Sequence, residues 1–284
     1  MLKKAILYMV LSAIAFTFLN VFVKSLGDFS VYQIVFFRSL GSLFFTIPFI
    51  IKNKIPILGN QKKILIFRSV FGLISMTLFF LSLKHIATGT AVSIRYIAPV
   101  FAAIFAVFFL KEKIKIMQWF LFVLAFIGVI ILKGIGNNLQ TQGILYALIS
   151  AIFAGLVYIS IRKIGDKDHP VIVVNYFMVI SVIVGGLLSI SNWKTPIGSQ
   201  WLTLLSLGFF GYFAQLYMTK AMQLGETNQI APLKYLEVIF TMLIGVIWLS
   251  EKYTFWSIVG ISLILLALVF NLIIKNKKRP KTNT

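Results

Sequence analysis

Long apolar runs, separated by short polar segments, account for most of this 284-residue chain. Each run is close to the roughly 20 residues that an α-helix needs to cross the hydrocarbon core of a bilayer. The pattern therefore predicts an all-α integral membrane protein with ten spanning helices, at approximately 5–26, 30–51, 64–84, 90–110, 116–133, 142–162, 171–191, 201–220, 228–249 and 254–274. The polar segments between them are too short to form a soluble domain.

The composition supports this interpretation and excludes other classes. Hydrophobic residues make up 60% of the chain and charged residues 12%, whereas a soluble domain carries about 25% charged residues. The net charge of +20 does not indicate nucleic-acid binding, because the lysines form short clusters between apolar runs. The chain has no cysteine, which excludes a disulfide framework and a thiolate metal site.

The distribution of basic residues predicts the orientation. With the N-terminus inside, 18 of the 27 lysines and arginines lie at cytoplasmic helix ends and five lie at outer ends. Basic residues favour the cytoplasmic side of a membrane. We therefore expect both termini in the cytoplasm, which requires an even number of crossings.

The chain also repeats itself at an offset of 138 to 139 residues. The matches include polar and aromatic positions, namely Gly27-Asp28 with Gly165-Asp166, Tyr96 with Tyr235, and Glu112-Lys113 with Glu251-Lys252. The sequence thus predicts two units, residues 1–138 and 139–284, with five spans each. Because five is odd, the second unit enters the membrane from the opposite side, giving an inverted repeat as in many secondary transporters.

Short motifs at matching places in the two units resemble a known family. They are Ala98–Ala103 running into Phe108–Lys113, Leu236–Phe240 through Trp248–Lys252, and the arginine of Phe36–Arg38. Together with the repeat they resemble the drug/metabolite transporter superfamily, with two EamA domains covering roughly residues 5–274.

This resemblance implies a carrier in a bacterial cytoplasmic (inner) membrane that moves amino acids, nucleotide-related metabolites, drugs or similar solutes. One departure concerns the proline that the family tends to carry after the residue matching Glu237. Val238 stands there, and Pro232 lies earlier, so the kink of the ninth span is expected to be displaced.

Charged residues inside spans are expensive and are candidates for function. Arg38 lies about nine residues into the second span, and its guanidinium suits a substrate carboxylate or phosphate. Arg95 and Lys234 match in the two units, and each is followed by a tyrosine, Tyr96 or Tyr235. We expect these five residues to bind substrate. The alternatives are a structural arginine bonded to backbone carbonyls and snorkelling at the membrane interface.

Glu237 is an acidic residue within the ninth span. It follows Lys234 by three residues, so an ion pair between them is one interpretation. Proton coupling of transport is the other.

Other polar residues have simpler interpretations. Arg68 is expected to be a snorkelling anchor at the start of the third span, and Glu112 and Glu251 are expected to cap helix ends. Neutral polar residues within spans favour bonds between helices, although any of them can also bond substrate: Asn20, Gln33, Asn175 and Gln215.

The residues argue against an enzyme. The three aspartates lie in loops, and His85 and His169 are far apart, so neither aspartyl nor zinc chemistry has its groups, and no cofactor or metal is expected. The expected partners are a small-molecule substrate and the lipid bilayer, and the sequence carries no signal for an oligomeric state. The alternative functions are a flippase for a lipid-linked substrate and a channel, which an internal inverted repeat fits less well.

Overall fold

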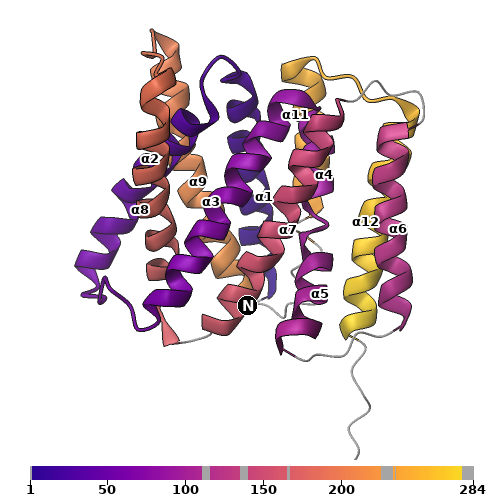
Figure 1. Ribbon diagram of the computed structural model, residues 1–284, viewed down its shortest axis with the longest axis horizontal. Helices are drawn as coiled ribbons and strands as arrows, with labels where there is room; N and C mark the ends of the chain where they lie inside the picture. The colour runs from indigo at the N-terminus through magenta and orange to yellow at the C-terminus, as the bar shows by residue number, and fades with distance from the viewer. Residues whose placement is uncertain are drawn as a thin grey trace, which may run out of the picture.

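The computed structural model describes residues 2–110, 116–134, 140–164, 167–224, 233 and 235–276 (Figure 1). Throughout these residues the regular structure is helical. The helices are α1 (Leu2–Ser25), α2 (Val31–Lys52), α3 (Lys62–His85), α4 (Thr88–Arg95), α5 (Ala98–Leu110), α6 (Ile116–Gly134), α7 (Thr141–Ile164), α8 (Pro170–Ser189), η2 (Ile190–Asn192), α9 (Ser199–Leu224), α11 (Leu236–Leu249) and α12 (Phe255–Asn276).

Their lengths and hydropathy confirm a multi-pass membrane protein. Within the described ranges, seven helical segments are long and apolar enough to cross a bilayer, and three shorter apolar helices accompany them. These ten segments correspond to the ten runs found in the sequence. Large apolar side chains such as Phe44 and Ile247 point outward, as expected for a surface in contact with lipid.

The fourth span, expected at 90–110, consists of two helices. It is divided into α4 and α5 at Tyr96–Ile97. Pro99 explains the break, because proline has no N–H to donate and its ring clashes with the carbonyl four residues earlier, that of Arg95. At the matching place in the ninth span, Tyr235 lies in a 3₁₀ turn and α11 begins at Leu236.

The helices run up and down between two ends of the bundle. Leu2 and Asn276 lie at one end, which we call the terminal end (Figure 1). At the other end, which we call the distal end, α1 finishes and α4 begins. There the Lys84 ammonium donates to the Gly27 carbonyl at 2.8 Å, and the Lys24 ammonium donates to the Ile86 carbonyl at 2.6 Å. α1 and α7 run in opposite directions, because α7 begins at the distal end.

The packing is shared between the first half of the chain, α1–α6, and the second half, α7–α12. The contacts between the halves include those of α1 with α9, α3 with α7, α2 with α8, α4 with α11 and α6 with α12. The repeat matches α1 with α7 and α3 with α9, so exchanging the halves turns the contact of α1 with α9 into that of α7 with α3. Each of the other three contacts joins two matching helices and is unchanged by the exchange. The two halves therefore form one bundle, and its interior is built from both.

Glycines bring helices of the two halves into backbone contact. A Cβ at Gly208 of α9 would lie 2.4 Å from the Cα of Gly41 of α2. Gly128 and Gly260 place α6 and α12 equally close, and Gly155 of α7 lies against Phe101 of α5. In lipid, the hydrophobic effect does not drive helices together. Small residues at such crossings allow the close van der Waals packing that does so instead.

Gly208→Ala is expected to push α2 and α9 apart and to destabilise the protein by about 1–3 kcal/mol, the usual effect of overpacking. The midpoint of thermal unfolding in detergent measures this effect. Gly27→Ala is the matched control, because a Cβ there meets only the Lys24 carbonyl at 3.7 Å. Equal unfolding midpoints for the two variants would contradict the proposed close contact.

Candidate functional site

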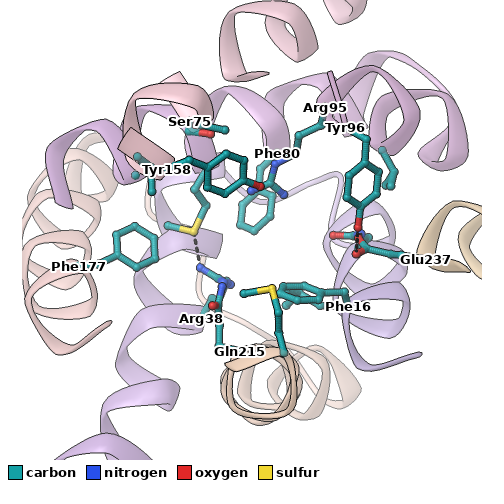
Figure 2. Close-up of a pocket in the computed structure, with 18 of the residues that line it drawn as sticks. Phe16, Arg38, Ser75, Phe80, Arg95, Tyr96, Tyr158, Phe177, Gln215 and Glu237 are labelled. Carbon is teal, nitrogen blue, oxygen red and sulfur yellow. Dashed lines mark hydrogen bonds between the residues drawn. The ribbon is translucent and has the colours of Figure 1, made fainter. Parts of the chain in front are cut away.

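A buried cavity of about 140 Å³ lies in the middle of the bundle (Figure 2). Helices of both halves line it. Its polar lining residues are Asn20, Arg38, Arg68, Ser75, Arg95, Tyr96, Tyr158, Gln215 and Glu237. The rest of the lining is mainly aromatic and aliphatic, which is the usual composition of a small-molecule site.

Three of these residues are arginines without an ion-pair partner. In the part of the chain that the structure describes, no carboxylate lies within salt-bridge distance of Arg38, Arg68 or Arg95. Arg38 and Arg68 are only 4% and 7% exposed. Burying an unpaired charge is costly, so the cavity carries a positive charge that favours an anion.

Aromatic rings supply part of the missing stabilisation. The Arg68 guanidinium lies 4.8 Å from the centre of the Phe177 ring, and that of Arg38 lies 6.0 Å from the same ring. Arg95 lies 4.2 Å from the ring centre of Phe79. Cation–π contacts of this kind contribute about 0.5–2 kcal/mol each, much less than burial of a full charge costs.

Arg68 was expected to be a snorkelling anchor, and that expectation is wrong. Its side chain is buried and lines the cavity, because Arg68, Gly72 and Ser75 form one face of α3 at the three- and four-residue spacing of a helix. Gly72 lets Phe177 of α8 approach closely, and this places the ring under the guanidinium. The spacing of Arg68, Gly72 and Ser75 along one helix face was the feature of the sequence that could have indicated a buried Arg68.

Arg95 also lies deeper than its position in the sequence indicated. It was placed near the outer end of the fourth span, but the span begins at Thr88 and breaks after Arg95. The side chain therefore leaves the last turn of α4 at mid-bundle and reaches the cavity (Figure 2).

Glu237 faces the arginines from the first turn of α11. Its Oε1 accepts a hydrogen bond from Asn20 Nδ2 at 3.0 Å, and its Oε2 accepts one from the Tyr96 hydroxyl at 2.5 Å. The N-terminus of α11 also favours a negative charge at this position. Lys234, the expected ion-pair partner of Glu237, lies outside the described residues.

The two tyrosines matched by the repeat meet at this point. Their rings pack edge to face, with centres 5.3 Å apart, and both are buried. Tyr96 lines the cavity, and Tyr235 packs behind it. Since Tyr96 directly follows α4 and Tyr235 directly precedes α11, the ends of these two helices meet beside Glu237.

The neutral polar residues divide into two groups. Asn20 and Gln215 line the cavity, whereas Gln33 bonds the backbone of Lys194 and Asn175 accepts from Thr46. The second group therefore joins helices, as polar residues inside membrane proteins commonly do.

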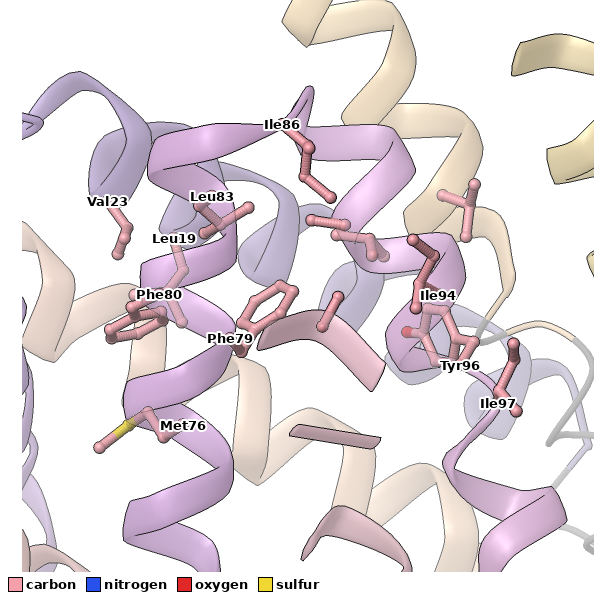
Figure 3. Close-up of a cluster of buried hydrophobic side chains, with 14 of the residues drawn as sticks. Leu19, Val23, Met76, Phe79, Phe80, Leu83, Ile86, Ile94, Tyr96 and Ile97 are labelled. Atoms are coloured by element: carbon pink, nitrogen blue, oxygen red, sulfur yellow. The ribbon is translucent and has the colours of Figure 1, made fainter. Parts of the chain in front are cut away.

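Apolar side chains close the cavity toward the distal end (Figure 3). They come from α1, α3 and the segment that follows α3, and all are nearly inaccessible: Leu19, Val23, Phe79, Phe80, Leu83 and Ile86. Two lining residues nearer the terminal end, Tyr158 and Ile161, are 38% and 41% exposed. Buried side chains therefore close the cavity toward the distal end, whereas its exposed lining residues lie toward the terminal end.

A polar contact between the halves holds the distal seal, and we call it the Glu251 latch. Glu251 Oε1 accepts hydrogen bonds from the Thr88 backbone N–H at 2.8 Å and the Thr88 hydroxyl at 2.7 Å. The Tyr253 hydroxyl donates to Glu251 Oε2 at 2.6 Å, and Lys24 lies 3.9 Å from Oε1. Glu251 was expected to cap a helix end, and the end that it caps is the start of α4 in the other half.

Tyr253 belongs to this latch as a donor. Burial and the neighbouring Glu251 carboxylate raise the pKa of Tyr253 above its ordinary value. The phenol therefore keeps its proton, and its oxygen accepts the Gly89 N–H at 3.0 Å. The equivalent Glu112 lies outside the described residues.

No metal site accompanies these groups in the described ranges, since no three His, Asp or Glu side chains lie close enough together to hold an ion. Apolar helices from two halves enclose a charged central cavity. This architecture is that of membrane carriers. The comparison with protein families gives the assignment within that class.

The chain belongs to the EamA-like transporter family, whose sequence profile matches it twice, at residues 3–133 and 141–273. It is therefore a membrane transporter of small metabolites and not an enzyme, as expected from its resemblance to the drug/metabolite transporters.

Relatives with named activities align over most of their length. The chain is 27% identical over 274 residues to the pseudopaline exporter CntI of Pseudomonas aeruginosa, covering 95% of this chain and 96% of that protein. It is 26% identical over 286 residues to an S-adenosylmethionine uptake transporter of Rickettsia prowazekii, covering 98% and 95%. Human solute carrier family 35 member G1 is 27% identical over 271 residues, covering 89% of this chain and 74% of that protein.

A solved crystal structure has the same fold. It superposes with a TM-score of 0.70 at 16% sequence identity, covering 98% of this chain and 100% of the other. At this level of identity the likeness concerns the fold alone.

Glu251→Gln is expected to weaken the latch and to open the distal end more often. Loss of one charged hydrogen bond, about 1–2 kcal/mol, corresponds to roughly a five- to thirty-fold larger open population. A cysteine introduced at the cavity residue Val92, in a chain that has no other cysteine, reports this opening by its rate of labelling with an impermeant maleimide from the distal side. Lys252→Gln, at an exposed neighbouring residue, is the control. Equal labelling rates in the two variants would rule out the latch.

Proposed function

We propose that this protein is a secondary transporter of a small polar metabolite that is anionic or zwitterionic, with an amino-acid-like or nucleotide-related structure. One observation carries the proposal: Arg38, Arg68 and Arg95 meet Glu237 in one buried cavity between the two halves. Three guanidiniums and one carboxylate favour a solute with net negative charge, because the solute supplies a counter-charge that the described residues do not supply.

The proposed mechanism is alternating access between two inverted five-helix units, residues 1–138 and 139–284. The opposite directions of α1 and α7 support this arrangement, as does the exchange of helix contacts between the halves. In the present state the exposed lining residues of the cavity lie toward the terminal end. Release of the Glu251 latch and closure near Tyr158 and Ile161 would expose it to the distal side.

Within the site, we assign Arg38, Arg95, Tyr96, Lys234 and Tyr235 to substrate binding, as expected from the sequence. Arg68 joins them because it lines the cavity. Glu237 is assigned to coupling: a proton on this carboxylate would remove the negative charge that the Asn20 and Tyr96 hydrogen bonds stabilise. A proton bound there would therefore change the affinity for substrate.

The orientation that we propose places the terminal end, with both termini, in the cytoplasm of a bacterial cell. The lysine-rich helix ends support it, because Lys52, Lys62 and Lys63 lie at that end. The relatives include an exporter and an uptake transporter, so this architecture serves transport in both directions.

The alternative, a flippase for a lipid-linked substrate, has one observation in its favour. An apolar groove of about 70 Å³ lies between α2, α8 and α9, and it shares Gln215 with the cavity. The groove is half the volume of the cavity and holds none of the arginines, so a soluble metabolite is the better-supported substrate.

Arg38→Ala is expected to lower transport at least tenfold, because a bidentate contact to the anion is lost, while insertion into the membrane is retained. The measurement is uptake of radiolabelled amino acids, nucleotides and organic anions into membrane vesicles, with and without a proton gradient. Lys62→Ala, at an exposed position of α3, is the control. Wild-type transport by Arg38→Ala would refute the role of this residue.

Asn53 and Ser191 test the inverted arrangement directly, because they match at the 138-residue offset and follow α2 and α8. Single cysteines at these positions are expected to react with an impermeant maleimide from opposite sides. The Ser191→Cys variant reacts in intact cells, and the Asn53→Cys variant reacts only after permeabilisation. Labelling of both from one side would exclude inverted halves.

A further inference from the structure

Three arginines reach the central cavity from three different helices. Arg38 belongs to α2, Arg68 to α3 and Arg95 to α4, and all three line the cavity. Figure 2 shows Arg38 and Arg95 reaching it from opposite sides. Arg38 lies within electrostatic range of both Arg68 and Arg95. The three positive charges therefore act on one shared space.

The charges of the cavity lining do not balance. Among the described residues, the charged side chains that line the cavity are these three arginines and Glu237. Counted as fully ionised, and whatever else it contacts, Glu237 offsets one positive charge and leaves two. Burying charge in an apolar bundle without a counter-charge is costly. A ligand with two negative charges balances this excess.

Two of the arginines also have unused hydrogen-bond donors. Within the described residues, Arg68 Nε and Nη1 and Arg38 Nε are buried without a hydrogen-bond partner. Arg38 Nη1 donates to the Met76 sulfur, which is a weak acceptor. Both arginines are more than nine-tenths buried, and buried donors nearly always have partners. In the wall of a cavity, such donors are completed by acceptor oxygens of a ligand.

Packing from both halves of the chain holds Arg38 and Arg68 near each other despite their like charge. Their guanidiniums lie 6.0 and 4.8 Å from the centre of the same Phe177 ring. Glycines that match at the 139-residue offset leave room for them. A Cβ at Gly72 would lie 3.8 Å from Arg68 Nη1, and one at Gly211 would lie 3.3 Å from Arg38 Nε. Two guanidiniums held in this way suit an oxyanion with several acceptor oxygens.

The cavity also limits the size of the ligand. One water molecule needs about 10–15 Å³ of cavity volume, so a cavity of about 140 Å³ holds a solute of roughly ten non-hydrogen atoms. A phosphate monoester or a dicarboxylate built on a short carbon chain has this size. Each carries about two negative charges near neutral pH, which is the charge that the lining leaves unbalanced.

Given the proposed transport function, on which this inference rests, we infer that the substrate is a small solute with a doubly charged oxyanion group. Arg38 and Arg68 bind the oxygens of this group, and Arg95 supplies the third positive charge. Arg68 is thus a specificity residue, because it lets the site distinguish two negative charges from one. A phosphate and a pair of carboxylates share this chemistry.

Calorimetric titration of the purified protein with matched probes tests this inference without requiring transport. Glycerol 3-phosphate is compared with its methyl diester, and succinate is compared with succinamate. In each pair the second probe has nearly the same shape but one negative charge less. A dianion is expected to bind at least tenfold more tightly than its monoanion, because it makes one more charged hydrogen bond. The pair that shows the preference identifies the oxyanion as phosphate or dicarboxylate.

Variants of the arginines separate recognition from a structural role. Arg68→Gln and Arg95→Gln are each expected to weaken the preferred dianion about tenfold and to leave its monoanion nearly unchanged, since one unbalanced charge remains. Loss of a merely structural residue would weaken both probes alike. Arg68→Lys, which keeps the charge without the planar fork, is expected to retain the preference and covers the case in which Arg68→Gln does not fold. Lys62→Gln, on the same helix but exposed, is the matched control.

Three outcomes would overturn the inference: monoanions that bind as tightly as their dianions, an unchanged preference in Arg68→Gln and Arg95→Gln, or no binding of either dianion. The proposed transport function fails separately. If vesicles move no radiolabelled solute while the preference for dianions holds, transport is wrong and the oxyanion site stands. If solutes are transported and monoanions compete as well as dianions, only the oxyanion site is wrong.

Discussion

Unbalanced positive charge in the middle of an apolar bundle is the constraint on which the rest of this structure depends. Arg38 and Arg68 are nearly inaccessible and Arg95 is partly buried, and aromatic rings offset only part of this burial. Close glycine contacts between the halves and the apolar distal seal keep the cavity narrow. Among the described residues, the charges of these arginines have no carboxylate within salt-bridge distance.

Elsewhere in the described residues, two buried or partly buried carboxylates have partners that position helices, in contrast to the arginines of the cavity. At the distal end, Glu251 lies near Lys24 and caps α4 through Thr88. Near the terminal end, the Asp168 carboxylate accepts the backbone N–H of Gln61 at 3.1 Å, just before α3. Each carboxylate comes from the second half and caps a helix of the first, so these pairs position helices. The cavity arginines have no such partners in the described residues.

The sequence predicted the general architecture because its signals are local. Apolar length and a repeated motif each lie within a short segment. They sufficed to predict the ten spans and to select Arg38, Tyr96 and Glu237, which line one cavity. Arg68 was misplaced because nearby lysines suggested a helix end, and its depth depends on Phe177, more than 100 residues away. The contact between Glu251 and Thr88 could not be predicted from the sequence either, because the two residues meet only after both halves pack.

The short helix α4 links the two parts of the molecule that must act together. Its eight residues span about 12 Å, with Thr88 bound by Glu251 at one end and Arg95 at the cavity on the other. A helix of this length is stiff, and its residues from Thr88 to Ile94 are buried against neighbouring helices. Because one stiff helix joins these two contacts, a shift of Thr88 at the Glu251 latch would also move Arg95 in the wall of the cavity.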